Sequence, residues 1–183
     1  MRTIAEHYFH DAHDFAARFD VLWENQTHKT GRIKSYVDLH MAAECALKSH
    51  IFVGRQYEDP KAVYALVRKA GHRIGALADA APYLAERTNY DAIKTQLDEF
   101  SVLIRYSLDA YDTFFPSLLE RDKARLKHSE TIGKNPWVLS VRTVVGALVD
   151  SIADEFNGLV SMDIEAILDN EQKIREFMDS VAK

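Results

Sequence analysis

The stretch from Tyr36 to Arg55 constrains the fold more than any other part of the chain. It reads YVDLHMAAECALKSHIFVGR, and neither Pro nor Gly interrupts it before Gly54. At about 100° per residue, Tyr36, Leu47 and Ile51 fall on one face of a helix. Apolar residues continue nearly all round this helix, which is typical of a helix in the middle of a bundle. The sequence therefore predicts a buried central helix.

Further amphipathic segments lie on both sides of this helix. With only 7 Gly and 4 Pro, the chain has few turns and long elements, and no strand-like alternation or hairpin dipeptide appears. The segments expected to be helical are residues 3–25, 34–54, 60–70, 72–81, 88–115, 136–157 and 161–182. We expect residues 1–183 to form one all-α domain, an antiparallel helical bundle of six or seven helices, with 34–54 central and antiparallel to the first helix.

Capping residues predict where several of these helices begin or end. Asp59 is suited to cap a helix whose first position is Pro60. Gly71 is suited to end that helix. Thr88 is expected to cap one long helix that continues to the neighbourhood of Pro116.

Charge is unevenly distributed along the chain. The formal net charge of −5 argues against a nucleic-acid partner for the chain as a whole. Residues 150–183 are strongly acidic, whereas residues 121–134 are locally basic. A solvated loop is the plainer interpretation of the basic segment, and a contact with nucleic acid is the other.

The single cysteine, Cys45, falls inside the central helix and has no partner for an internal disulfide. This composition favours a reducing, cytoplasmic location. No signal peptide is recognisable after Met1, and no apolar run approaches the roughly 20 residues that span a bilayer. We therefore expect no membrane association.

The first helix contains a His-rich stretch, HYFHDAHD, that resembles a metal site. His7, Asp11 and Asp14, or His10 with Asp14, have the spacing of residues on one helical face. These side chains fall opposite the apolar stripe that includes Phe19, and no other segment supplies a matching ligand. We expect no functional metal there. No glycine-rich phosphate loop, cysteine-rich zinc pattern or serine nucleophile motif is present, and no cofactor is expected.

The central helix and the turn after the next helix together carry a family resemblance. AAECALKSHIFVGR, followed after about twenty residues by GHRIGAL, resembles the HEPN signature of an A-x-E-x-x-L-K run and a His-Asp-Leu-like turn. The matching positions are Ala42, Ala43, Glu44, Leu47, Lys48, His72, Ile74 and Leu77, with Arg105-Tyr106 resembling a later Arg-Tyr pair. The resemblance covers about residues 8–156 and leaves 160–183 as an additional acidic C-terminal helix. It implies a helical bundle that forms a homodimer.

Many HEPN proteins are metal-independent ribonucleases with an R-x4-6-H motif. The pair in this chain that matches the motif is Arg121 and His128, inside the basic segment. Histidine can transfer the proton when a ribose hydroxyl attacks the adjacent phosphate, and arginine can hold that phosphate. The resemblance thus implies Arg121 and His128 as catalytic residues, with Lys123, Arg125 and Lys127 as nucleic-acid contacts.

Four polar residues are expected to support such a site or to pair among themselves. His40, Glu44 and Lys48 form a row at i, i+4 and i+8, and His72 belongs to the second half of the signature. Pairing along the helix is the simpler interpretation of the row, and orientation of an active-site arginine by Glu44 is the other.

Two functions remain open from the sequence. The first is a non-catalytic binding module for a partner protein, RNA or nucleotide. The alternative is a metal-independent endoribonuclease that uses Arg121 and His128. The resemblance implies a toxin–antitoxin or phage-defence setting for it, because many HEPN proteins act in such systems.

Overall fold

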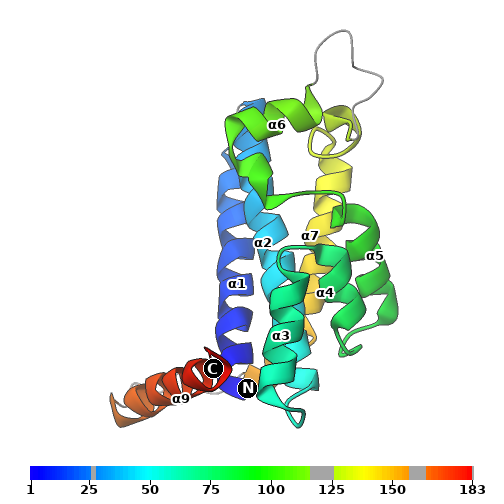
Figure 1. The fold of residues 1–183 in the computed structure, drawn as a ribbon. Helices are drawn as coiled ribbons and strands as arrows, with labels where there is room; N and C mark the ends of the chain where they lie inside the picture. Colours follow the sequence, from blue (N-terminus) through cyan, green and yellow to red (C-terminus); the bar gives the residue numbers. More distant parts are fainter. Residues whose placement is uncertain (26–27, 116–125, 157–163, 183) are drawn as a thin grey trace.

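The fold consists of helices joined by turns and irregular segments (Figure 1). The computed structural model describes residues 1–25, 28–115, 126–156 and 164–182, and within these ranges it contains no strand. The α-helices are α1 (Arg2–Glu24), α2 (Lys29–Gly54), α3 (Pro60–Ala70), α4 (Ile74–Ala80), α5 (Arg87–Leu97), α6 (Ser107–Phe114), α7 (Asn135–Asp150), α8 (Ala153–Phe156) and α9 (Ile164–Ala182). Two short 3-10 helices, η1 (Val102–Arg105) and η3 (His128–Glu130), complete the list. The all-α prediction is confirmed.

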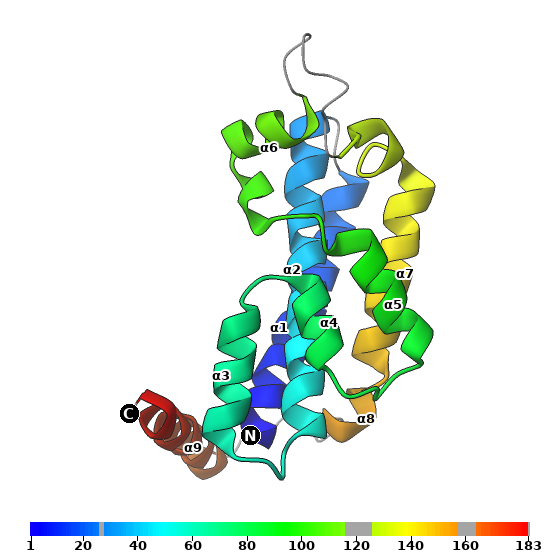
Figure 2. The same ribbon diagram turned by 45° about the vertical axis from the view of Figure 1, so that its right-hand side comes forward.

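Helix α2 is the centre of the bundle. It runs antiparallel to α1 along most of its length and also contacts α3, α4, α7 and η1 (Figures 1 and 2). Tyr36, Leu47 and Ile51 are fully buried, as predicted. Phe100 and Val145 cover α2 from the neighbouring elements and are buried as well. Burial of each such side chain stabilises the fold by about 1.5–3 kcal/mol, so the α2 interfaces hold much of the core together.

The boundaries of α3 follow the predicted capping residues. The Asp59 carboxylate accepts a hydrogen bond of 3.1 Å from the Ala62 backbone N–H, and Pro60 occupies the first turn. At the other end Gly71 adopts a φ of 62°, a left-handed conformation that glycine tolerates best. These local signals therefore determine where the chain turns toward α4.

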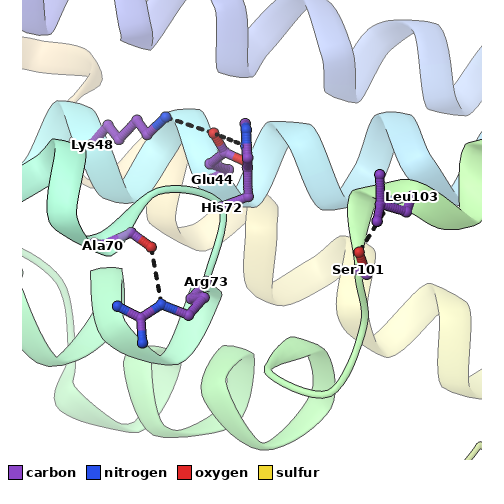
Figure 3. A network of polar contacts seen from close by, with 7 residues as sticks. All are labelled: Glu44, Lys48, Ala70, His72, Arg73, Ser101 and Leu103. Carbon is purple, nitrogen blue, oxygen red and sulfur yellow. Dashed lines mark hydrogen bonds and ion pairs between the residues drawn. The ribbon is translucent and has the colours of Figure 1, made fainter.

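The single long helix predicted for 88–115 is wrong. The chain leaves the helix after Leu97, and the Ser101 hydroxyl accepts a hydrogen bond of 3.1 Å from the Leu103 backbone N–H, which begins η1 (Figure 3). The Asp98 carboxylate accepts a bond of 2.7 Å from the backbone N–H of Gly75. This bond joins the end of α5 to the first turn of α4. The helix therefore ends where Asp98 can contact a residue that is distant in sequence.

The predicted number of six or seven helices is also wrong. The ranges that the structure describes contain nine α-helices, because α5 and α6 replace one long segment and the short α8 follows α7. Thr88 lies inside α5 and does not cap it; Glu86 occupies the capping position without a side-chain bond. No helix among the described residues is both long and apolar enough to cross a membrane.

Helix α9 lies across the end of the bundle where α1 begins (Figures 1 and 2). Phe177 is its buried anchor, and its ring lies 5.7 Å from the ring of Tyr64 on α3 and 6.1 Å from that of Phe52 on α2. The predicted C-terminal helix is thus present and is joined to the bundle by aromatic packing.

Candidate functional site

A buried carboxylate lies at the middle of α2. Glu44 is only 1% exposed, and its Oε1 accepts a hydrogen bond of 2.6 Å from the ammonium group of Lys48 one turn later. The other oxygen lies 2.8 Å from Nδ1 of His72 (Figure 3). The pairing of Glu44 with Lys48 expected from their spacing is present. Because a buried charge without a partner is costly, these two contacts are what allow Glu44 to lie inside the bundle.

The turn between α3 and α4 delivers His72 to this carboxylate. Gly71 reverses the chain, and the Arg73 guanidinium then donates a hydrogen bond to the carbonyl oxygen of Ala70 (Figure 3). It donates a second one to the carbonyl oxygen of Lys69. These bonds hold the end of α3 and fix the position of the turn. The His72 side chain remains 62% exposed although its Nδ1 lies against the Glu44 carboxylate.

His40 lies one turn before Glu44 and is as deeply buried. Neither of its ring nitrogens makes a hydrogen bond of normal geometry with a described residue, although the Phe100 backbone lies near enough to raise the pKa of His40. The hydroxyl of Tyr36, one turn earlier, also has no such bond. Burial lowers the pKa of His40 to about 4, while the negative charge of Glu44 acts in the opposite direction. The imidazole is therefore neutral at pH 7, and His40 is a neighbour of the Glu44 cluster rather than a hydrogen-bonded member of it.

The chemistry of this cluster is limited. A histidine held by a carboxylate is an arrangement that general bases use. The adjacent Cys45, however, is buried, and burial raises the pKa of its thiol to about 12, so it is not a nucleophile. The geometry of Glu44, Lys48 and His72 is that of a charge network that joins α2 to the α3–α4 turn.

Two other predicted site residues, Lys127 and His128, lie near the start of α2. His128 begins η3 and lies against the rings of Phe114 and Phe115, with centroid distances of 5.8 and 5.3 Å. Burial lowers the pKa of His128, and the positive charges of Lys29 and Arg32 lower it further. Its Nε2 atom is buried and forms no hydrogen bond with any residue of the described ranges.

Aromatic rings support the two cations from α2. The Lys29 ammonium lies 5.5 Å from the ring centre of Phe115, and the Arg32 guanidinium lies 4.4 Å from that of Trp23. Lys127 is exposed beside His128 and pairs with Glu130 at 3.2 Å. We call Lys29, Arg32, Lys127 and His128 the basic end of the bundle. The contribution of Lys29 and Arg32 to it was not recognised from the sequence, because about one hundred residues separate them from His128.

Three of the predicted site residues, Arg121, Lys123 and Arg125, lie outside the described residues. The Glu44 cluster and the basic end do not meet. At a rise of 1.5 Å per residue, Lys29 and Glu44 lie about 22 Å apart along α2. Glu44 is therefore too distant to orient a group beside His128.

A third histidine, which sequence reasoning did not single out, joins three helices. His50 is fully buried on α2; its Nδ1 lies 2.6 Å from the Tyr90 hydroxyl on α5, and its Nε2 lies 2.8 Å from the Leu148 carbonyl oxygen on α7. Because the carbonyl can only accept, Nε2 donates to it and Nδ1 accepts from Tyr90. Burial lowers the pKa of His50 to about 4. The sequence contained one indication of this role: His50 falls inside a helix predicted to be buried, where a polar side chain needs hydrogen-bond partners.

The His-rich stretch of α1 is exposed. His7, His10 and Asp14 face away from the core, and His10 lies 4.0 Å from Glu6. Across the described ranges, no three His, Cys, Asp or Glu side chains are placed to hold a metal ion.

Comparison of the chain with models of protein families, with curated proteins and with solved structures found no match. The HEPN assignment consequently rests on the signature residues alone and remains a hypothesis.

Proposed function

We propose that this protein is a non-catalytic, HEPN-like binding module whose basic end holds the phosphate backbone of single-stranded RNA. The observation that carries the proposal is that Lys29, at the start of α2, and His128, on η3, lie against the same ring, that of Phe115, at 5.5 and 5.3 Å. Arg32 follows Lys29 by about one turn of α2, and its charge also acts on His128. Segments distant in sequence thereby place positive charge on one end of a chain whose net charge is −5.

The composition of the basic end fits a polyanion better than an acidic protein surface. Cations beside exposed phosphates release counterions, and this release supplies most of the affinity for nucleic acid. Phe115 and Trp23 lie directly beneath Lys29 and Arg32, and both rings are partly exposed. Partly exposed rings among cations can stack on the bases of a single strand.

The surroundings of His128 favour binding over cleavage. Its Nε2 is buried and lies next to the rings of Phe114 and Phe115. A β-carbon added at Gly133 would come within 2.7 Å of its Nδ1, so Gly133 packs closely against that side of the ring. A general acid or base must reach within about 3 Å of the proton that it transfers. In this arrangement the buried Nε2 has no room for a substrate.

The alternative function, a metal-independent endoribonuclease that uses Arg121 and His128, has one observation in its favour. The lowered pKa of His128 keeps its imidazole neutral near pH 7, which is the state that a general base requires. Incubation of varied RNAs with the protein and excess chelator separates the two functions. Binding without cleavage supports the module, whereas cleavage that leaves 2′,3′-cyclic phosphate ends and is lost in His128→Ala supports the enzyme.

The binding proposal is tested with a fluorescent twelve-nucleotide oligo(U) in anisotropy titrations at several salt concentrations. Lys29→Gln should weaken binding and make the dependence of log K on log salt shallower by about 0.7, the contribution of one phosphate contact on a single strand. Lys173→Gln, an exposed lysine of α9, is the matched control and should change neither quantity. Equal effects of the two variants, or no binding at low salt, would contradict the proposal.

A further inference from the structure

A pocket of about 400 Å³ lies where α1, α3 and α9 meet, away from the basic end. Helix α1 contributes His7, Tyr8 and Asp11, α3 contributes Tyr64, and α9 contributes Phe177 and Met178, together with isoleucines from α1 and α9. Pockets of this size accommodate small organic ligands. Figures 1 and 2 place α9 against both of the other helices at this end of the bundle.

The walls of the pocket are suited to an apolar group. The rings of Tyr64 and Phe177 meet at 5.7 Å and 82°, so they form two sides of a corner. Tyr8 is stacked against Phe52 with an interplanar angle of 9°, which fixes the orientation of a third ring. Because these rings are held by one another, the walls need little reordering when a ligand binds.

Asp11 supplies the charge that selects a head group. Its side chain is exposed, and it forms no hydrogen bond or ion pair with any described residue. Two cations lie against the aromatic wall: Lys48, 5.4 Å from the ring centre of Tyr8, is paired with Glu44, and Arg68 lies 5.9 Å from the ring centre of Tyr64. Neither pairs with Asp11. The carboxylate of Asp11 is thus available to a ligand, and a positively charged group is what it would bind.

We propose that this pocket binds a small amphipathic amine, with its apolar body between Tyr8, Tyr64 and Phe177 and its ammonium group on Asp11. The apolar body enters the aromatic corner, because transfer of its surface out of water is favourable. The ammonium group remains at the rim, where it donates to the carboxylate and stays partly hydrated. The proposal is independent of RNA binding, since the basic end lies at the other end of α2.

The test uses 2-phenylethylamine as the probe, in calorimetric titrations of the full chain. Asp11→Asn preserves the shape of the side chain and removes its charge, so affinity should fall about tenfold, the loss expected for one charge-assisted hydrogen bond. Asp14→Asn is the matched control, because Asp14 is exposed on the same helix and does not line the pocket; its affinity should stay within about twofold. In NMR spectra, the methyl signal of Met178 should shift on binding.

Two analogues complete the test. 3-Phenylpropionate, which has the same ring and a negative head group, should bind at least about tenfold more weakly than the amine, because Asp11 repels it. 2-Phenylethanol should fall between the two. The proposal is overturned if the amine does not bind at 10 mM, if Asp11→Asn binds it as tightly as the wild type, or if the carboxylate binds as well as the amine.

Discussion

Nδ1 of His72 lies 2.8 Å from the buried carboxylate of Glu44, although 28 residues separate the two in the chain. The contact joins the exposed α3–α4 turn to the centre of α2. Glu44 thus has two partners that differ in their exposure to water. The Lys48 side chain is only 12% exposed, whereas that of His72 is largely exposed. The two partners should therefore differ in their effect on stability.

Glu44→Gln should lower the free energy of unfolding by about 3–5 kcal/mol, because it leaves the sheltered Lys48 ammonium without its counter-charge. His72→Ala removes a contact that water screens and should cost less than about 1 kcal/mol. Urea denaturation of both variants measures the difference. Equal losses would mean that the two contacts with Glu44 are equivalent.

Stability should fall as the pH is lowered from about 6.5 to 4. Burial lowers the pKa of His40 and of His50 to about 4, whereas an unfolded histidine titrates near 6.5. Above pH 6.5 both histidines are neutral in the folded and in the unfolded chain, so their protonation costs no stability there. As the pH falls from 6.5 to 4, the unfolded chain binds protons that the folded chain does not, and the free energy of unfolding decreases. The loss amounts to about 3 kcal/mol for each histidine.

Urea titrations at pH 7, 5.5 and 4.5 check this prediction. His50→Gln should reduce the pH dependence by about half, although the variant itself is less stable because the bonds to Tyr90 and Leu148 change. His10→Gln, at an exposed position, is the control and should leave the pH dependence unaltered. A flat stability profile between pH 7 and 4.5 would contradict the burial of neutral histidines.

Leu47→Ala should cost about 2–5 kcal/mol, because it removes a fully buried side chain from the central helix and leaves a cavity. Leu108→Ala is the control; this leucine of α6 is 85% exposed, and its replacement should change stability by no more than about 0.5 kcal/mol. Thermal or chemical denaturation suffices for both. A loss below about 0.5 kcal/mol for Leu47→Ala would show that Leu47 does not lie in the core and that another face of α2 is buried.

Gly75→Ala should destabilise the protein, because a β-carbon at this position would come within 2.4 Å of the Asp98 carboxylate and displace its bond to the Gly75 N–H. We expect a loss of about 1–3 kcal/mol, because the buried residue Gly75 would lose the acceptor of its N–H group. Gly146→Ala is the matched control in the interior of α7, where the nearest atom is Nη1 of Arg142 at 3.2 Å. Asp20 holds this guanidinium through its other two nitrogens, and a small shift of its end relieves the contact. It should be neutral or stabilise the helix by up to about 1 kcal/mol.

The HEPN resemblance implies a homodimer. Sedimentation equilibrium should then give a mass near twice the 20.9 kDa of one chain at micromolar concentrations. A mass of one chain across a wide range of concentrations would contradict the homodimer. It would also weaken the case for the HEPN resemblance.

The sequence alone determined the helical elements that depend on neighbouring residues. The apolar surface of 36–55 predicted a buried central helix, and Asp59, Pro60 and Gly71 predicted both ends of α3. Helical periodicity and capping operate within a few residues, and for that reason they can be recognised without knowledge of the fold.

The tertiary structure alone decided which distant groups meet. The break between α5 and η1 depends on the bond from Gly75 to Asp98, and the shielding of Glu44 depends on where the α3–α4 turn places His72. The approach of Lys29 to His128 depends on how the start of α2 packs beside η3. Such contacts join residues tens of positions apart, and they form only when the buried faces of several helices have fixed the positions of their ends.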